Sequence, residues 1–251
     1  MHLEEFAEGN SFFHRLDPRV KFVTFMPYAL VVALMKGIKY PAIALVVSTL
    51  MIMASRVSWK KLFNRLGVVN FFILFLWLFL PFSYVGIEVF HIGPFSATHE
   101  GFLLALTITL KANAIVIATI AFLGTSEVFS LAHALVHLKI PNKLVYLFFF
   151  FYRYISVLHN EYTTLKRAIS VRAFRAKSNM HTYKTYAYLV GMLLVRSYDS
   201  SLRIYNAMLC RGFTGKFPVI SHFHMHLRDY AFGIFMVCLT LFIGFLSYSG
   251  R

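Results

Sequence analysis

Long runs of hydrophobic residues alternate along this chain with short polar stretches. A helix needs about 20 apolar residues to cross a bilayer, with roughly 17 to 25 as the usual range. Residues 66–82, 102–123 and 230–248 meet that requirement. Two shorter runs, 20–35 and 41–54, form either two spans or a re-entrant pair, and we expect two spans. The pattern therefore predicts an all-α, polytopic membrane protein with about five spans.

Basic residues are distributed unevenly between the connections that join these runs. Residues 55–65 carry four Lys or Arg, whereas residues 83–101 carry none. Because cytoplasmic connections are enriched in Lys and Arg, we expect 55–65 inside and 83–101 outside. The N-terminus then lies inside and the C-terminus outside. Lys36 and Lys39 go against this rule, because they fall in a predicted external turn.

Between the fourth and fifth predicted spans, the hydrophobic positions recur with the period of an α-helix. Two stripes of large apolar residues show the spacing i, i+4, i+7, i+11, which indicates one apolar face of each helix. The stripes are Leu158, Tyr162, Leu165 and Ile169, and then Tyr198, Leu202, Tyr205 and Leu209. The sequence therefore predicts a helical domain over 139–228, between an N-terminal membrane part (1–138, with a connecting amphipathic segment) and a last span (229–251).

Each apolar stripe leads into a similar heptapeptide, A-[IM]-x-x-R-[AG]-F. The first contains Arg172 and Ala173, and the second contains Arg211 and Gly212. A small residue after the arginine suits a helix that is about to end, and Gly212 is a natural C-cap. A cation is favoured there by the helix dipole, so simple capping is one interpretation. A paired docking device for a two-fold partner is the other, because a small residue permits close approach and Arg binds carboxylates or carbonyls.

Composition supports the membrane prediction and localises the charge. Of 251 residues, 59% are hydrophobic and only 14% are charged, which excludes both an ordinary soluble domain and a disordered chain. The formal net charge is +15. Residues 139–228 hold 14 Lys or Arg against 2 Asp or Glu, so 12 of those 15 charges belong to the predicted helical domain. The acidic N-terminus does not resemble a cleaved signal peptide, so we expect the first hydrophobic segment to be retained.

Lys111 falls in the middle of the predicted span 102–123. An ammonium group there is costly unless it pairs, faces the bundle interior or contacts another subunit. Asn113 lies about 200° further around the helix and is a poor partner. A functional charge and a structural or snorkelling one both remain possible interpretations.

The paired arginine motifs resemble those of the T component (EcfT family) of energy-coupling factor (ECF) transporters. The segment 14–21, HRLDPRVK, is similar to the opening of that family, and residues 196–215 resemble its cobalt/nickel subgroup, the CbiQ type. The resemblance covers nearly the whole chain. The family often has Ala before each arginine, where this chain has Val171 and Cys210, and Ala173 replaces Gly in the first motif.

The resemblance implies a multi-pass coupling subunit of the plasma membrane, with no substrate site, cofactor or ATPase activity of its own. Two ABC-type ATPase subunits would hydrolyse ATP, and a membrane S component would bind the metal. Cytoplasmic helices of this chain would dock in the ATPases and move the S component, for cobalt or nickel or, alternatively, another micronutrient or vitamin. The docking residues carried over are Arg172, Ala173, Arg211 and Gly212, supported by Val171, Phe174, Cys210 and Phe213. No G-x-x-x-x-G-K-[ST] motif occurs in the sequence, in agreement with separate ATPases.

Three other classes of protein share some of these features. A metal-binding membrane protein could use the i, i+4 pair His133 and His137, but no Asp, Glu or Cys cluster completes it. It could also use His222, His224 and His226, although these precede the last span and are explained equally well as interfacial histidines. Nucleic-acid binding fits the pI of about 9.9, yet membrane sidedness accounts for the basic residues, so no nucleic-acid partner is expected. An intramembrane protease would need a serine or aspartate dyad within the spans, which the sequence lacks.

Overall fold

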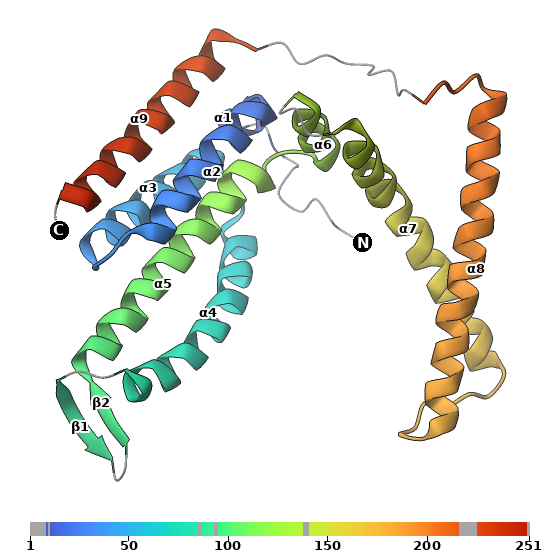
Figure 1. The fold of residues 1–251 in the computed structure, drawn as a ribbon, viewed down its shortest axis with the longest axis horizontal. Helices are drawn as coiled ribbons and strands as arrows, with labels where there is room; N and C mark the ends of the chain where they lie inside the picture. The colour runs from blue at the N-terminus through green and yellow to red at the C-terminus, as the bar shows by residue number, and fades with distance from the viewer. Residues whose placement is uncertain are drawn as a thin grey trace. The chain divides into compact units, whose positions relative to one another are not determined.

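The structure is a computed structural model of the chain, and it describes residues 9, 11–84, 87–92, 95–137, 141–215 and 225–249. Helices make up most of this part (Figure 1). In chain order the elements are α1 (Phe12–Arg15), α2 (Pro18–Leu34), α3 (Lys39–Ser55), α4 (Trp59–Ser83), β1 (Glu88–Ile92), β2 (Phe95–Thr98), α5 (His99–Thr119), the π-helix η1 (Ile120–Gly124), α6 (Val128–His137), α7 (Asn142–Val171), α8 (Met180–Cys210) and α9 (Leu227–Ser249). The all-α membrane class is confirmed, with a short antiparallel hairpin, β1–β2, as the one addition among the described residues.

The chain divides into two compact units. One runs from residue 141 to 222 and contains α7 and α8, and we call it the helix-pair unit. The other, which we call the membrane unit, contains the remaining elements, from residues 2–140 and 223–251. The chain therefore leaves the membrane unit after α6 and returns to it before α9.

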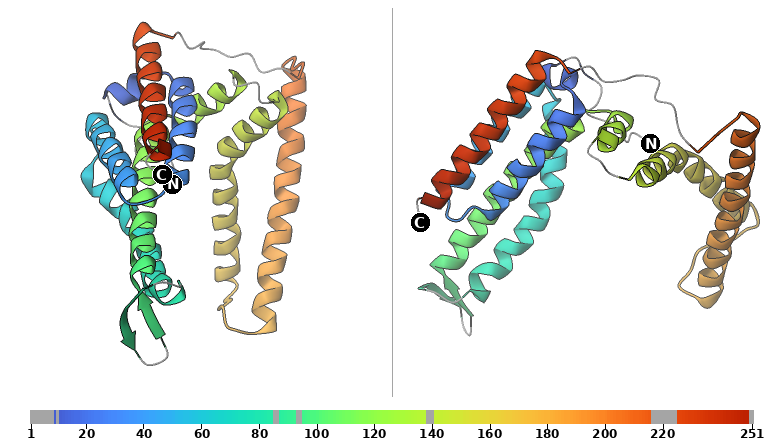
Figure 2. Two further views of the ribbon diagram at one scale, coloured as in Figure 1. Left: turned by 60° about the vertical axis from the view of Figure 1, so that its left-hand side comes forward. Right: turned by 45° about the horizontal axis from the view of Figure 1, so that its top comes forward.

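Helix α5 lies at the centre of the membrane unit (Figure 2). It packs against α2, α3 and α4, and α9 packs against α2 and α3. The contact of α4 with α5 is close at Gly101, where an added Cβ would stand 2.7 Å from the Cα of Pro81. A buried Tyr28 joins α2 to α3, because its hydroxyl donates a hydrogen bond to the carbonyl of Ala44 at 2.8 Å. Hydrophobic side chains from all these helices form one core.

Helix α2 begins where the sequence HRLDPRVK places a cap. Asp17 is the N-cap residue, and its side chain accepts a hydrogen bond from the backbone N–H of Arg19 at 2.8 Å. Pro18 follows at the first helical position, where the missing N–H costs nothing. At the other end, Gly37 adopts a φ of +72° in the turn to α3, which a residue with a side chain rarely adopts.

Three helices of the described part are long and apolar enough to cross a membrane, namely α4, α5 continued by η1, and α9. They contain the predicted spans 66–82, 102–123 and 230–248. Helix α3 contains the run 41–54, and α2 contains the run 20–35 except for its last residue. Each helix has 17 residues, or a length of about 25 Å at 1.5 Å per residue. That is somewhat shorter than a hydrocarbon core of about 30 Å, so the number of spans stays a prediction.

Candidate functional site

The first arginine motif forms the C-terminal cap of α7. Arg172 is the C-cap residue, and Ala173 follows it in the left-handed region with a φ of +57°. The N–H of Ala173 donates to the carbonyl of Ser170 at 3.1 Å, and the N–H of Phe174 donates to the carbonyl of Ile169 at 3.4 Å. This pair of hydrogen bonds defines a Schellman motif.

The second motif forms the same cap at the end of α8. Arg211 is the C-cap residue and Gly212 has a φ of +78°. The N–H of Gly212 donates to Leu209 at 2.9 Å, and the N–H of Phe213 donates to Met208 at 3.0 Å. The repeated heptapeptide is thus a repeated backbone structure. The helix end predicted at Gly212 is confirmed, and the positive φ accounts for glycine at this position, whereas Ala173 adopts a positive φ despite its Cβ.

These caps leave both arginine side chains exposed, as are Ala173, Cys210 and Gly212. Val171, directly before the first arginine, is 87% exposed. The two phenylalanines of the motifs are partly buried, and the ring of Phe174 lies 6.0 Å from that of Tyr186 on α8. Each motif therefore presents a guanidinium group at the end of a helix, while its phenylalanine turns back toward the protein.

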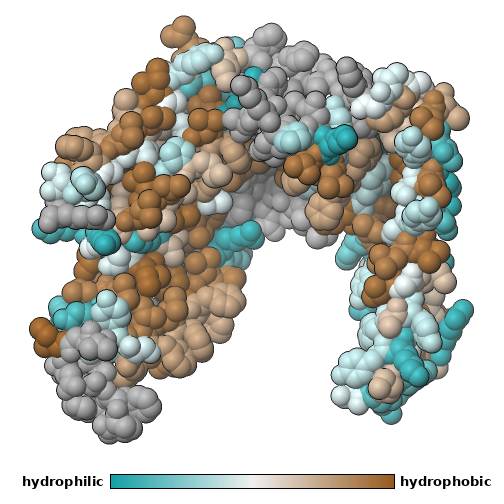
Figure 3. Space-filling model, in the orientation of Figure 1, coloured by the Kyte–Doolittle hydropathy of each residue, from teal (hydrophilic) through white to brown (hydrophobic). Residues whose placement is uncertain are grey.

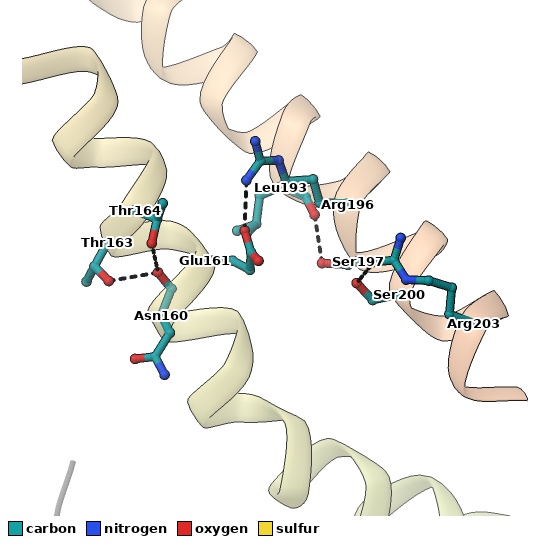
Figure 4. A network of polar contacts seen from close by, with 9 residues as sticks. All are labelled: Asn160, Glu161, Thr163, Thr164, Leu193, Arg196, Ser197, Ser200 and Arg203. Atoms are coloured by element: carbon teal, nitrogen blue, oxygen red, sulfur yellow. Dashed lines mark hydrogen bonds and ion pairs between the residues drawn. The ribbon is translucent and has the colours of Figure 1, made fainter. Parts of the chain in front are cut away.

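Helices α7 and α8 pack against one another and run in opposite directions (Figures 1 and 2). Arg196 of α8 donates a hydrogen bond to Glu161 of α7 at 3.0 Å, forming an ion pair between the helices (Figure 4). Because the helices are antiparallel, Arg172 and Arg211 lie at opposite ends of the pair. Helix α8 has 31 residues, so the two ends are separated by about 45 Å.

The helix pair buries few of its own apolar side chains. Among the described residues of α7 and α8, Val145 and Leu189 are the buried hydrophobic ones. The second stripe predicted from the sequence stays exposed, with Tyr198, Leu202, Tyr205 and Leu209 all more than 40% accessible. In Figure 3 hydrophobic residues cover much of the membrane unit, while the helix-pair unit shows hydrophobic and hydrophilic residues together. The helix pair thus carries an apolar surface that another surface can cover.

Lys111 has a partner that the sequence did not predict. Its ammonium group donates a hydrogen bond to the backbone carbonyl of Ala33 at 2.9 Å, in the last turn of α2. Carbonyls at a helix C-terminus lack intrahelical partners and favour a cation. Asn113 points elsewhere, donating to Asn70 of α4 at 3.0 Å. Lys111 therefore joins α5 to the end of α2.

A cluster of buried polar residues at the start of α2 and α9 was missed by the sequence analysis. Lys21 is 0% exposed, and its ammonium donates hydrogen bonds to Ser126 at 2.7 Å and Thr125 at 3.3 Å, directly after η1. Asp17 and Asp229, 6% and 3% exposed, are near enough to attract this ammonium. The sequence signal was present in HRLDPRVK and in the lone acidic residue before the last span.

Asp229 connects the two helix starts directly. One carboxylate oxygen accepts a hydrogen bond from the N–H of Asp17 at 3.3 Å, and the other accepts from the N–H of His226 at 2.9 Å. The second bond is the backward half of a capping box, since Asp229 stands three residues after His226, the residue that precedes α9. The chain re-enters the membrane unit at the start of α9, so this cluster holds the start of α9 against the start of α2.

The histidine candidates for a metal site are mostly outside the described residues. His222 and His224 lie there, and the side chains of His133 and His137 are not described. His226 lines a cavity of about 370 Å³ together with Asp17 and Asp229. Within the described residues no group of three or more His, Cys, Asp or Glu side chains could hold a metal ion.

A comparison with models of known protein families identifies the family of this chain. The family model CbiQ, described as "Cobalt transport protein", matches residues 9–222. The chain belongs to the CbiQ family. The match includes both arginine motifs, α2 and the cluster residue Lys21. The family predicted from the sequence is therefore confirmed.

Relatives of this CbiQ family member include transmembrane proteins named EcfT of energy-coupling factor transporters. The protein of Streptococcus equi subsp. equi is 24% identical over 265 residues, covering 99% of this chain and 97% of the relative. The protein of Bacillus subtilis is 25% identical over 226 residues, covering 86% of this chain and 85% of the relative. An uncharacterized protein of Methanocaldococcus jannaschii is 26% identical over 145 residues, and that match spans half of the relative's length. The chain is thus similar over most of its length to transmembrane proteins of ECF transporters.

Proposed function

We propose that this chain couples ATP hydrolysis in two ABC-type ATPase subunits to the movement of a substrate-binding S component. The helix-pair unit is the cytoplasmic coupling domain, and the membrane unit lies in the plasma membrane with its N-terminus inside. ATP binding and hydrolysis belong to the partner subunits. This chain transmits the motion between them and the S component.

One observation carries this proposal: two exposed arginines stand in the same backbone cap at opposite ends of an antiparallel helix pair. Each end fits one of two equivalent subunits, as a two-fold pair of ATPases requires. A planar guanidinium group binds carboxylates or carbonyls with two hydrogen bonds, so Arg172 and Arg211 suit the role of anchors. Simple helix capping would not require that the caps be identical or that both side chains stay exposed.

The exposed apolar side chains of α7 and α8 supply the second contact. An apolar surface of this extent on a membrane protein subunit is typical of an interface with another subunit or with lipid. We assign it to the S component and to the adjoining membrane surface. When the ATPases close, the anchored helix ends shift and this apolar surface shifts with them.

The transported substrate is cobalt or nickel in this proposal. The supporting observation is the description of the matching family as a cobalt transport protein. Selectivity belongs to the S component, so an S component for another micronutrient or vitamin is the alternative. Uptake of radioactive cobalt, nickel and a vitamin such as biotin by cells that express this chain with its partner subunits distinguishes the two.

Reversing the charge of both anchors tests the docking role. The variant Arg172→Glu with Arg211→Glu should insert into the membrane but lose the ATPases during copurification, and substrate uptake should fall to background. Anchoring arginines at interfaces contribute about 2–4 kcal/mol each, so each single variant should weaken ATPase binding by at least about 30-fold.

The matched control is Arg175→Glu with Arg203→Glu, which changes the charge of the same unit equally at two other exposed positions. It should keep both ATPase binding and uptake. Normal copurification and uptake in the Arg172→Glu, Arg211→Glu variant would refute the docking role. Equal loss in the control would show that net charge matters and that the two motifs do not act as anchors.

A further inference from the structure

Three lysines line one cavity at the end of the membrane unit where α2 gives way to α3. Lys36 and Lys39 come from the turn between these helices and from the first residue of α3, and Lys111 comes from α5. The cavity has a volume of about 940 Å³. It also reaches Tyr84, directly after α4, and Ser247, near the end of α9. Helices α3, α5 and α9, the α2–α3 turn and the residue after α4 thus contribute to a single site.

The lining carries an excess of positive charge. The acidic residue among the lining residues is Glu100, and one of its carboxylate oxygens already accepts a hydrogen bond from the N–H of Ile87 at 2.8 Å. The ammonium group of Lys111 uses one of its three N–H donors in the hydrogen bond to the carbonyl of Ala33. Lys36 and Lys39 are exposed, and neither forms an ion pair with another residue in the described part of the chain. The lining therefore has a net positive charge that a bound anion would balance.

The rest of the lining is mainly apolar, from Met35, Ile38, Leu103 and Leu104. Leu34, at the end of α2 beside this cavity, is 68% exposed. A small hydrated anion would gain nothing from this apolar surface. An amphiphile with an anionic headgroup matches both the ammonium groups and the apolar walls.

We propose that this cavity binds the phosphate headgroup of an anionic phospholipid, with its acyl chains along the apolar walls. Basic pockets between transmembrane helices bind anionic headgroups by this same chemistry. The proposal also accounts for the two lysines that disobey the sidedness rule. They lie in a predicted external turn because they hold a lipid there, whereas the predicted external connection 83–101 carries no Lys or Arg.

Native mass spectrometry of the full-length chain tests the site. The purified protein in detergent micelles is titrated with dioleoylphosphatidylglycerol and, separately, with dioleoylphosphatidylcholine. The wild type should retain one tightly held phosphatidylglycerol. The variant Lys36→Gln with Lys39→Gln should bind it about 30-fold more weakly, because each basic residue near a headgroup contributes about 5-fold. Binding of phosphatidylcholine should be equal in both proteins.

The variant Lys60→Gln with Lys61→Gln is the matched control, since it removes two exposed lysines at the start of α4. Equal loss of phosphatidylglycerol in this control would overturn the proposal in favour of diffuse attraction. Displacement of the lipid by glycerol phosphate at the same concentration would overturn it in favour of a soluble phosphate ligand. If the Lys36→Gln, Lys39→Gln variant does not fold, the pair Lys36→Arg with Lys39→Arg decides, because it should keep the lipid and its loss there would refute the site.

Discussion

At the scale of single residues, the position after each motif arginine is governed by backbone conformation. Gly212 and Ala173 both have a positive φ, and a residue with a Cβ pays about 1 kcal/mol more than Gly in that region. An added Cβ at Gly212 would meet no atom within 4 Å, so space is not limiting. The choice of residue there therefore changes the stability of the cap directly.

Replacing Gly212 by Ala and Ala173 by Gly should change the stability of the two caps in opposite directions. Gly212→Ala should weaken the second cap, so that the amide of Phe213, which donates to Met208, exchanges its hydrogen about 5-fold faster. Ala173→Gly should slow exchange at the amide of Phe174 by about the same factor. Hydrogen exchange read by mass spectrometry measures both, with each variant serving as the control for the other. An unchanged rate at Phe213 would contradict the role of the positive φ.

At the scale of elements, Lys21 joins three of them. Its ammonium donates a hydrogen bond to Ser126 after η1, and it is attracted by Asp17 before α2 and Asp229 in the first turn of α9. Replacing one partner in a buried set of charges leaves the others uncompensated, which costs about 3–5 kcal/mol. Lys21→Met should therefore lower the melting temperature in detergent by about 10 °C.

A double variant separates the electrostatic effect from lost packing. Lys21→Met with Asp229→Asn removes one cation and one anion, so it should melt at a higher temperature than Lys21→Met alone. Lys60→Met, at an exposed lysine of α4, should leave the melting temperature unchanged. A double variant that melts no higher than Lys21→Met would show that the carboxylates do not act on Lys21.

Much of the element structure could be predicted from the sequence, because it depends on local patterns. The runs of apolar residues located α2 to α5 and α9, and the heptapeptides located the ends of α7 and α8. The partners of Lys111 and Lys21 could not be predicted, because they are set by which helices pack together. Ala33 lies 78 residues before Lys111, and a backbone carbonyl leaves no mark in the sequence.

At the scale of the whole molecule, α2 and α3 form either two membrane spans or a re-entrant pair. Both helices are about 25 Å long, while α5 with η1 has 26 residues and spans about 39 Å. Lys111, 12 residues into α5, meets the end of α2, so the α2–α3 turn lies about 18 Å along α5 from its start. The turn is thus recessed relative to the start of α5. It lies beside the lysine-lined cavity, which would attract lipid headgroups and water to the turn.

Labelling with a membrane-impermeant maleimide decides between two spans and a re-entrant pair. In a background with Cys210→Ser and Cys238→Ser, the variant Lys36→Cys should be labelled in intact cells, because five spans place this exposed turn outside. Ser58→Cys, between α3 and α4, should be labelled only after permeabilisation, since it precedes the basic start of α4. Labelling of both positions only after permeabilisation would mean that α2 and α3 form a re-entrant pair. The basic cavity would still open on the outer side, because Tyr84 and Glu100, which also line it, belong to the predicted external connection 83–101.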